Sequence, residues 1–61
     1  MPALLARRAL ARAAAGTTVE IFCDDPLAPI DVPHMCHERG YEVLTLERTG
    51  SVTHMVLRRP A

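Results

Sequence analysis

The stretch that decides the fold joins a strand-like run to a helix-like run, and it reads Cys23-Asp24-Asp25-Pro26-Leu27-Ala28-Pro29-Ile30-Asp31-Val32-Pro33-His34-Met35-Cys36. It holds both cysteines of the chain and three of its five prolines. Aspartate before proline is typical of a turn, because the carboxylate accepts hydrogen bonds from nearby amides and proline fixes its own φ. The stretch therefore predicts a connection at which a strand ends and a helix begins.

The length and charge of the chain limit its class. We expect residues 1–61 to form a single domain, since 61 residues suffice for no more than one. Seven basic residues, all arginine, balance seven acidic ones, which argues against a general nucleic-acid binder and hints at a bacterial source. The sequence has no secretory signal and no apolar run near the ~18 residues of a membrane span. These features predict a cytoplasmic protein with reduced cysteines.

The region before the quoted stretch predicts one helix and one strand. Residues 2–15 are rich in alanine and leucine, with Pro2 in the first turn and Gly16 as the stop. A period of 3.6 residues places on its apolar face Leu5, Ala6, Ala9, Leu10 and Ala13, and on its opposite face Arg7, Arg8 and Arg12. Residues 17–23 alternate as a strand does, so we expect its helix-facing side chains to be Val19, Ile21 and Cys23.

Within the quoted stretch, prolines limit where the second helix can begin. We expect an irregular turn over residues 26–30 after Asp25, and a regular helix that begins with Asp31 as its N-cap and has Pro33 in its first turn. Its end is predicted at Arg39, followed by a left-handed Gly40. Its buried side is expected to hold Val32, Met35 and Cys36, and its exposed side His34, His37 and Glu38.

The last third of the chain predicts a β-hairpin. Residues 41–47 and 52–59 are strand-like, and the turn between them is centred on Gly50. The inward residues are expected to be Leu44, Leu46, Met55 and Leu57. The order helix, strand, helix, hairpin predicts an α+β fold. A helix that precedes the first strand of a two-layer fold usually crosses over from an earlier strand, which this sequence does not contain.

The sequence resembles the TusA (SirA-like) sulfur carriers along its whole length. The residues that carry the resemblance are Pro-x-Leu-Leu-x-Arg-Arg-Ala-Leu at 2–10, Gly16, Val19-x-Ile21-x-x-Asp24-Asp25-Pro26, Asp31-Val32-Pro33-x-x-Cys36, Gly40 and Val56-Leu57-Arg58-Arg59. The resemblance implies a two-layer α/β sandwich in the order βαβαββ, with two helices on one face of a mixed sheet. Without the first strand, this chain becomes αβαββ.

The resemblance also implies a function. Family members take persulfide sulfur from a donor such as a cysteine desulfurase or rhodanese and pass it to an acceptor protein, without a cofactor. Their carrier cysteine begins a Cys-Pro-x-Pro motif, whose last two positions match Met1-Pro2 here. The carrier cysteine is thus absent, so whether the chain is a sulfurtransferase stays open. Either the start site is mis-assigned or the chain is a shortened relative.

Two other functions remain in view. One is a non-catalytic binding or regulatory module with the same fold. A weaker one is RNA binding, because the C-terminal domain of translation initiation factor three shares the βαβαββ topology. The residues expected to meet protein partners are Pro2, Leu4, Arg8 and Arg12.

A carrier thiol must be exposed and have a lowered pKa, because the thiolate is the nucleophile. Cys36 falls on the apolar side of a helix, and Cys23 faces inward at a strand end. Both are weak candidates that we expect to pack in the core. The remaining motif residues, Asp24, Asp25, Pro26, Asp31 and Pro33, are interpreted as capping and turn residues.

Two further expectations concern a metal site and assembly. His34 and His37 lie three residues apart and could share an ion if His54 joined them, but exposed histidines are the simpler interpretation and we expect no metal. Loss of the first strand would leave residues 17–23 at an open sheet edge. Since open edges invite pairing, we expect a homodimer there.

Overall fold

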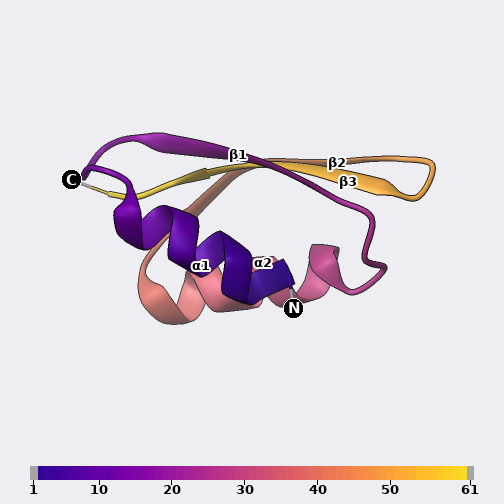
Figure 1. Cartoon of the computed structure of the whole chain (residues 1–61), viewed down its shortest axis with the longest axis horizontal. Coiled ribbons are helices and arrows are strands. Elements are labelled where there is room, and N and C mark those ends of the chain that lie inside the picture. The colour runs from indigo at the N-terminus through magenta and orange to yellow at the C-terminus, as the bar shows by residue number, and fades with distance from the viewer. Residues whose placement is uncertain (1, 61) are drawn as a thin grey trace.

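The computed structural model describes residues 2–60, which form two helices and three strands. The elements are α1 (Pro2–Arg12), β1 (Thr18–Cys23), α2 (Ala28–Arg39), β2 (Glu42–Thr49) and β3 (Val52–Arg58). Both helices pack against the same face of the sheet, and the C-terminal end of β3 lies close to the C-terminal end of α1 (Figure 1). The α+β class and the predicted order of elements are confirmed.

The strands form one sheet in the order β1-β3-β2. β3 is central and pairs antiparallel with β1 on one side and β2 on the other. The parallel pair that would make the sheet mixed is not found among residues 2–60, so the described sheet is purely antiparallel rather than mixed. An additional first strand stays a prediction.

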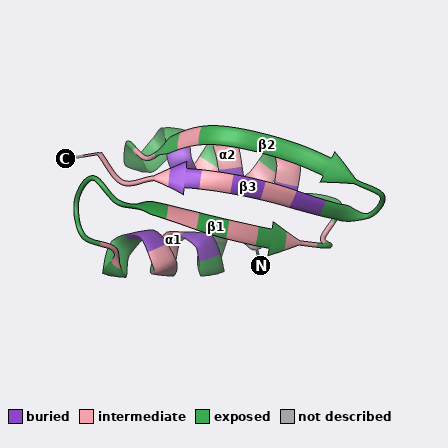
Figure 2. Cartoon of the chain, turned by 90° about the horizontal axis from the view of Figure 1, so that it is seen from above, coloured by how far each residue is buried: buried purple, intermediate pink, exposed green. Residues whose placement is uncertain are grey.

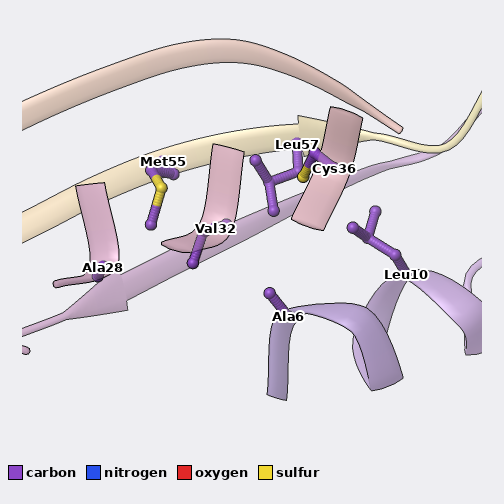
Figure 3. Close-up of a cluster of buried hydrophobic side chains, with 7 residues drawn as sticks. All are labelled: Ala6, Leu10, Ala28, Val32, Cys36, Met55 and Leu57. Atoms are coloured by element: carbon purple, nitrogen blue, oxygen red, sulfur yellow. The ribbon is translucent and has the colours of Figure 1, made fainter. Parts of the chain in front are cut away.

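The core lies between the helices and the inner face of the sheet (Figure 3). Its fully buried apolar residues recur every second residue along β3 and every fourth residue along the helices, and they are Ala6, Leu10, Ala28, Val32, Cys36, Met55 and Leu57. The side chains of β1 that face the helices are only partly buried; they are Val19, Ile21 and Cys23. The inward positions predicted for β1, α2 and β3 are confirmed.

α1 ends three residues earlier than its alanine-rich sequence predicts. Its last helical residue is Arg12, and Gly16 adopts a left-handed φ of 84° in the connection to β1. The Gly16 amide donates to the carbonyl of Arg59 over 2.6 Å. The connection therefore bonds to the end of the sheet, which is more favourable than a further, unburied turn of helix.

The placement of Leu5 on the apolar face of α1 was wrong. Ala6 and Leu10 are buried, but 66% of Leu5 is exposed. α1 runs alongside β1 instead of beneath the middle of the sheet (Figure 2). Only the side of the helix that carries Ala6 and Leu10 is therefore covered.

α2 begins earlier than the prolines suggested, with Leu27 as N-cap and Ala28 as its first residue. The N-cap role predicted for Asp31 was wrong, since Asp31 lies in the first turn. Pro29 fits there because the first amides of a helix have no intrahelical acceptor. Ala28 is fully buried, so packing against the sheet stabilises this early start. The end at Gly40 is confirmed, with φ at 75° and its amide bonded to the Cys36 carbonyl.

Of the inward pair predicted for β2, the placement of Leu44 was wrong. The pairing of β2 with β3 shifts between Val43 and Thr45, and this bulge contains Leu44. Val43 packs against the core, whereas 47% of Leu44 is exposed. Leu46 lies opposite the buried Met55 and so faces the helices as predicted, but on this outer strand it is still 40% exposed.

Candidate functional site: two inward thiols and an exposed helix face

Cys36 is held inside the core by the spacing of α2. It follows Val32 by one helical turn, and only 1% of its surface is exposed. Burial raises the pKa of the Cys36 thiol, because a thiolate loses its hydration in apolar surroundings. The group is thus kept protonated and out of reach of another protein.

Cys23 is the more accessible of the two thiols. It ends β1, lies opposite the buried Thr53 of β3, and is half-buried on the helix-facing side of the sheet. Both cysteines are free thiols. Cys23 lies at a strand end, just before the turn at Asp25. Its side chain is therefore partly exposed to solvent although it faces the helices.

The residues expected to meet partners lie along α1. Leu4, Arg8 and Arg12 follow one another at intervals of four residues, so they share one side of the helix. Arg8 and Arg12 are exposed and Leu4 is 36% exposed. We call these three side chains the α1 outer face. Pro2 begins the same helix, but its side chain lies outside the described ones.

Arg59 has a role that the sequence did not reveal. Its guanidinium Nη1 donates to the carbonyls of Ala11 and Ala13, over 3.0 and 2.8 Å. The Ala11 carbonyl lies in the last turn of α1 and the Ala13 carbonyl just beyond it, where carbonyls have no partner within the helix. The positive charge of Arg59 also suits the negative end of the helix dipole. A C-terminal arginine thus fixes the helix that carries the α1 outer face. No local signal could have indicated a bond between residues 46 positions apart.

The acidic and proline residues of the quoted stretch shape the turn before α2. The Asp25 carboxylate accepts the amide of Leu27 over 2.8 Å, and the Asp25 carbonyl accepts the amide of Ala28 over 3.1 Å. Asp24 and Pro26 are exposed. Asp31 places a negative charge near the N-terminus of α2, where the dipole favours it. Pro33 lies inside the helix, not in its first turn as predicted.

The three histidines do not come together. His34 pairs with Glu38 on the exposed side of α2, with Nε2 and Oε1 2.5 Å apart, and His37 is exposed nearby. His54 lies on the outer face of the sheet, where its ring stacks on Phe22. Its Nε2 is 3.0 Å from Glu20 Oε2, a close contact without hydrogen-bond alignment. Residues 2–60 contain no group of three side chains able to hold a metal ion.

Within residues 2–60, neither helix is long and apolar enough to cross a membrane.

A comparison with protein families found a match that extends over nearly the whole chain. The family model described as sulfurtransferase TusA matches residues 1–59, a range that includes both helices, all three strands and Arg59. Because the match extends over nearly the whole chain, the protein belongs to the TusA family, whose members serve in sulfur relay.

Proposed function

We propose that this chain is a sulfur-relay protein of the bacterial cytoplasm that docks with a persulfide donor and a sulfur acceptor, and in which neither Cys23 nor Cys36 is the carrier thiol. The donor is a cysteine desulfurase or a rhodanese. Family membership supports the relay role. Both thiols face inward, and this observation is the reason to assign the carrier step to another residue.

Sulfur transfer makes two demands on a carrier thiol. Its thiolate attacks the outer sulfur of the donor persulfide, the donor S–S bond breaks, and the donor leaves as a thiolate while the carrier becomes a persulfide. The step needs no external oxidant, but the attacking sulfur must be ionised and must reach the donor. Cys36 meets neither demand, because it is buried and its pKa is raised.

The carrier position implied by the family motif lies ahead of α1. There, free amides and the positive end of the helix dipole would stabilise a thiolate. The 61 residues contain no cysteine at that place, since their two cysteines are at 23 and 36. In this proposal the carrier step therefore belongs to neither Cys23 nor Cys36, and the α1 outer face supplies docking contacts beside the position ahead of α1.

A second function fits the same observation. A binding or regulatory module needs the fold and the docking surface but no reactive thiol. The burial of Cys36 and the inward position of Cys23 favour this alternative over a carrier that uses either of them. The two functions differ in whether a thiol placed at the start of α1 receives sulfur.

The test is persulfide loading by a desulfurase. The chain is incubated with a cysteine desulfurase, its pyridoxal phosphate and cysteine, and intact mass spectrometry then detects any added sulfur atom. We expect no adduct on Cys23 or Cys36, because a donor cannot reach a thiolate at either place. An adduct that disappears in a Cys23→Ser variant would show that Cys23 is the carrier and would contradict the proposal.

A gain-of-function variant separates the two candidate functions. Leu4→Cys places a thiol in the first turn of α1, where the native side chain is partly exposed. We expect this variant to gain one sulfur atom, while an Ala14→Cys control beyond the other end of α1 does not. Equal loading of both variants, or of neither, would reject donor docking at the start of α1 and favour the binding module.

A further inference from the structure

The outer face of the sheet brings an aromatic pair and carboxylates together. Figure 2 looks onto this face, with β1, β3 and β2 side by side and both helices behind them. Because Met55 and Leu57 are buried against the helices, the residues between them, and His54 before them, face the other way. The register then places Phe22 of β1 on one side of His54 and Glu47 of β2 on the other.

Phe22 and His54 form a flat aromatic surface that is partly open to water. Their ring centroids are 4.4 Å apart and the rings are inclined by only 15°, so the two rings stack. The His54 side chain is 31% exposed, whereas 66% of Phe22 is exposed. A partner that covers the phenyl ring would remove apolar area from water, which is favourable.

The charges of this face are mostly negative. In the strands of residues 2–60, its charged side chains are three glutamates and one arginine, namely Glu20, Glu42, Glu47 and Arg58. Glu20 and Glu47 are exposed, and Glu20 Oε2 is 3.0 Å from His54 Nε2. The face of an aromatic ring also attracts positive charge, so rings and carboxylates favour the same kind of partner. This face therefore suits a cationic partner and repels phosphate groups.

The sheet-face cluster, as we call Glu20, Phe22, His54 and Glu47, lies on three strands that pair with one another. A sheet widens within its own plane. A further strand beside β1 would therefore lie next to this face and would not cover it. The exposure of the cluster thus follows from the arrangement of the helices, which occupy the opposite face (Figure 2).

We propose that the sheet-face cluster is a docking site for a basic segment of a protein partner that carries arginine. One guanidinium stacks on the Phe22 ring beside Glu20, and a second cationic side chain pairs with Glu47. Arginine fits better than lysine, because its planar, weakly hydrated group stacks on aromatic rings and pairs with carboxylates through two hydrogen bonds. This interaction surface is independent of the sulfur-relay proposal.

A segment of a protein fits the cluster better than a small cation or a second copy of the chain. Glu20 and Glu47 belong to the two outer strands, which are about 10 Å apart because β3 lies between them. A small cation at one end leaves the other carboxylate without a partner, whereas a segment with two arginines pairs with both. A second copy docked through the α1 outer face would leave its own cluster open, so the copies would form open chains.

Titration of the labelled protein, followed by NMR, measures the docking. The probe is a capped Gly-Arg-Gly-Arg-Gly peptide, and the matched peptide has citrulline at both arginines, which keeps the shape and removes the charge. We expect the arginine peptide to shift the amide resonances of Phe22, His54 and Glu47 but not those of the buried Val32 and Cys36. The citrulline peptide and free arginine should bind about tenfold more weakly, because charge attractions are lost.

Variants of the protein make the result specific. Glu47→Gln should weaken the arginine peptide about threefold, whereas Glu38→Gln, which changes an exposed glutamate of α2, should not affect it. Phe22→Leu stays apolar but loses the ring, and it should also weaken binding about threefold, while Phe22→Tyr should preserve it. Unchanged amide resonances of Met55 would show that each variant still folds.

Any of four results would overturn the proposal. One is the absence of shifts at the cluster at the highest soluble concentration of the arginine peptide. Another is equal binding of the citrulline peptide or of free arginine, which would exclude a basic segment as the preferred occupant. The third is an equal loss of affinity in Glu47→Gln and Glu38→Gln. The fourth is a shift of the cluster resonances with protein concentration alone, which would identify a second copy as the occupant.

Discussion

The two cysteines of the chain differ in burial because of the residues around them. Cys36 lies among the side chains that join α2 to the sheet and is fully buried, whereas Cys23 ends a strand and is only half-buried. Burial raises the pKa of the Cys36 thiol by disfavouring its charged form. At the scale of the residue, the fold thus treats Cys36 as a small apolar side chain.

The raised pKa of Cys36 predicts a loss of stability in alkaline solution. The pKa of a cysteine in an unfolded chain is about 8.5, and burial raises the pKa of folded Cys36 above its ordinary value. Below the unfolded pKa both states hold the proton, so the contribution of Cys36 is complete. As pH rises toward the folded pKa, only the unfolded state loses the proton, and the free energy of unfolding falls.

Urea unfolding at a series of alkaline pH values measures this effect. We expect Cys36→Ala to be less stable than the native chain near neutral pH, by about 1 kcal/mol or more, but to lose less stability as the pH rises. Cys23→Ala is the matched control and should keep the native slope. If the free energy of unfolding fell with pH equally in Cys36→Ala and in the native chain, the raised pKa of Cys36 would not be the cause of the loss.

Helix α1 depends on the opposite end of the chain. It is 11 residues long, and isolated helices of this length are marginal in water. Two long-range bonds from Arg59 hold its last carbonyls, and the bonds between Arg59, Gly16 and Thr17 tie its connection to the sheet. At the scale of the element, α1 is therefore stable only as part of the folded chain.

Substitution of Arg59 should weaken α1. We expect Arg59→Ala to lower the free energy of unfolding by about 1–2 kcal/mol, because two hydrogen bonds from a charged donor are lost at a partly exposed site. Arg58→Ala is the matched control, since Arg58 makes neither bond. Urea unfolding followed by circular dichroism measures the loss. Equal effects of the two substitutions would argue against capping by Arg59.

The positive and negative charges of the whole molecule balance, but part of the positive charge is gathered on α1. Seven arginines and seven acidic residues cancel, while Arg8 and Arg12 stand together on the α1 outer face. A neutral molecule with a local basic surface attracts an acidic partner at short range, and salt weakens the attraction. At the scale of the whole molecule, the α1 outer face is thus the basic surface on which the proposed docking depends.

Charge reversal tests the α1 outer face. We expect Arg8→Glu with Arg12→Glu to weaken binding to a desulfurase or rhodanese donor about tenfold at low salt, because two exposed attractive contacts become repulsive. Two exposed arginines outside α1, Arg39 and Arg48, provide a control of the same charge change when both are replaced by Glu. Isothermal calorimetry compares the affinities. An unchanged affinity, or the same loss in both variants, would contradict docking through α1.

The parts of the fold that depend on neighbours in sequence could be predicted. Alternation along β3 placed Met55 and Leu57 inward, the helical period placed Val32 and Cys36 on one side, and Gly40 stopped α2. These follow from local geometry, since a strand repeats every two residues and a helix every 3.6. The inward position of both thiols follows from the same periods and was therefore correctly predicted.

What the sequence by itself determined is the set of elements, their order and the motifs that belong to the TusA family. Only the tertiary structure decided the start of α2, the bulge at Leu44, the exposure of Leu5 and the reach of Arg59 to α1. The physical reason is that burial and long-range hydrogen bonds depend on residues distant in sequence. Packing of Ala28 against the sheet thus prevailed over the prolines that predicted a later helix.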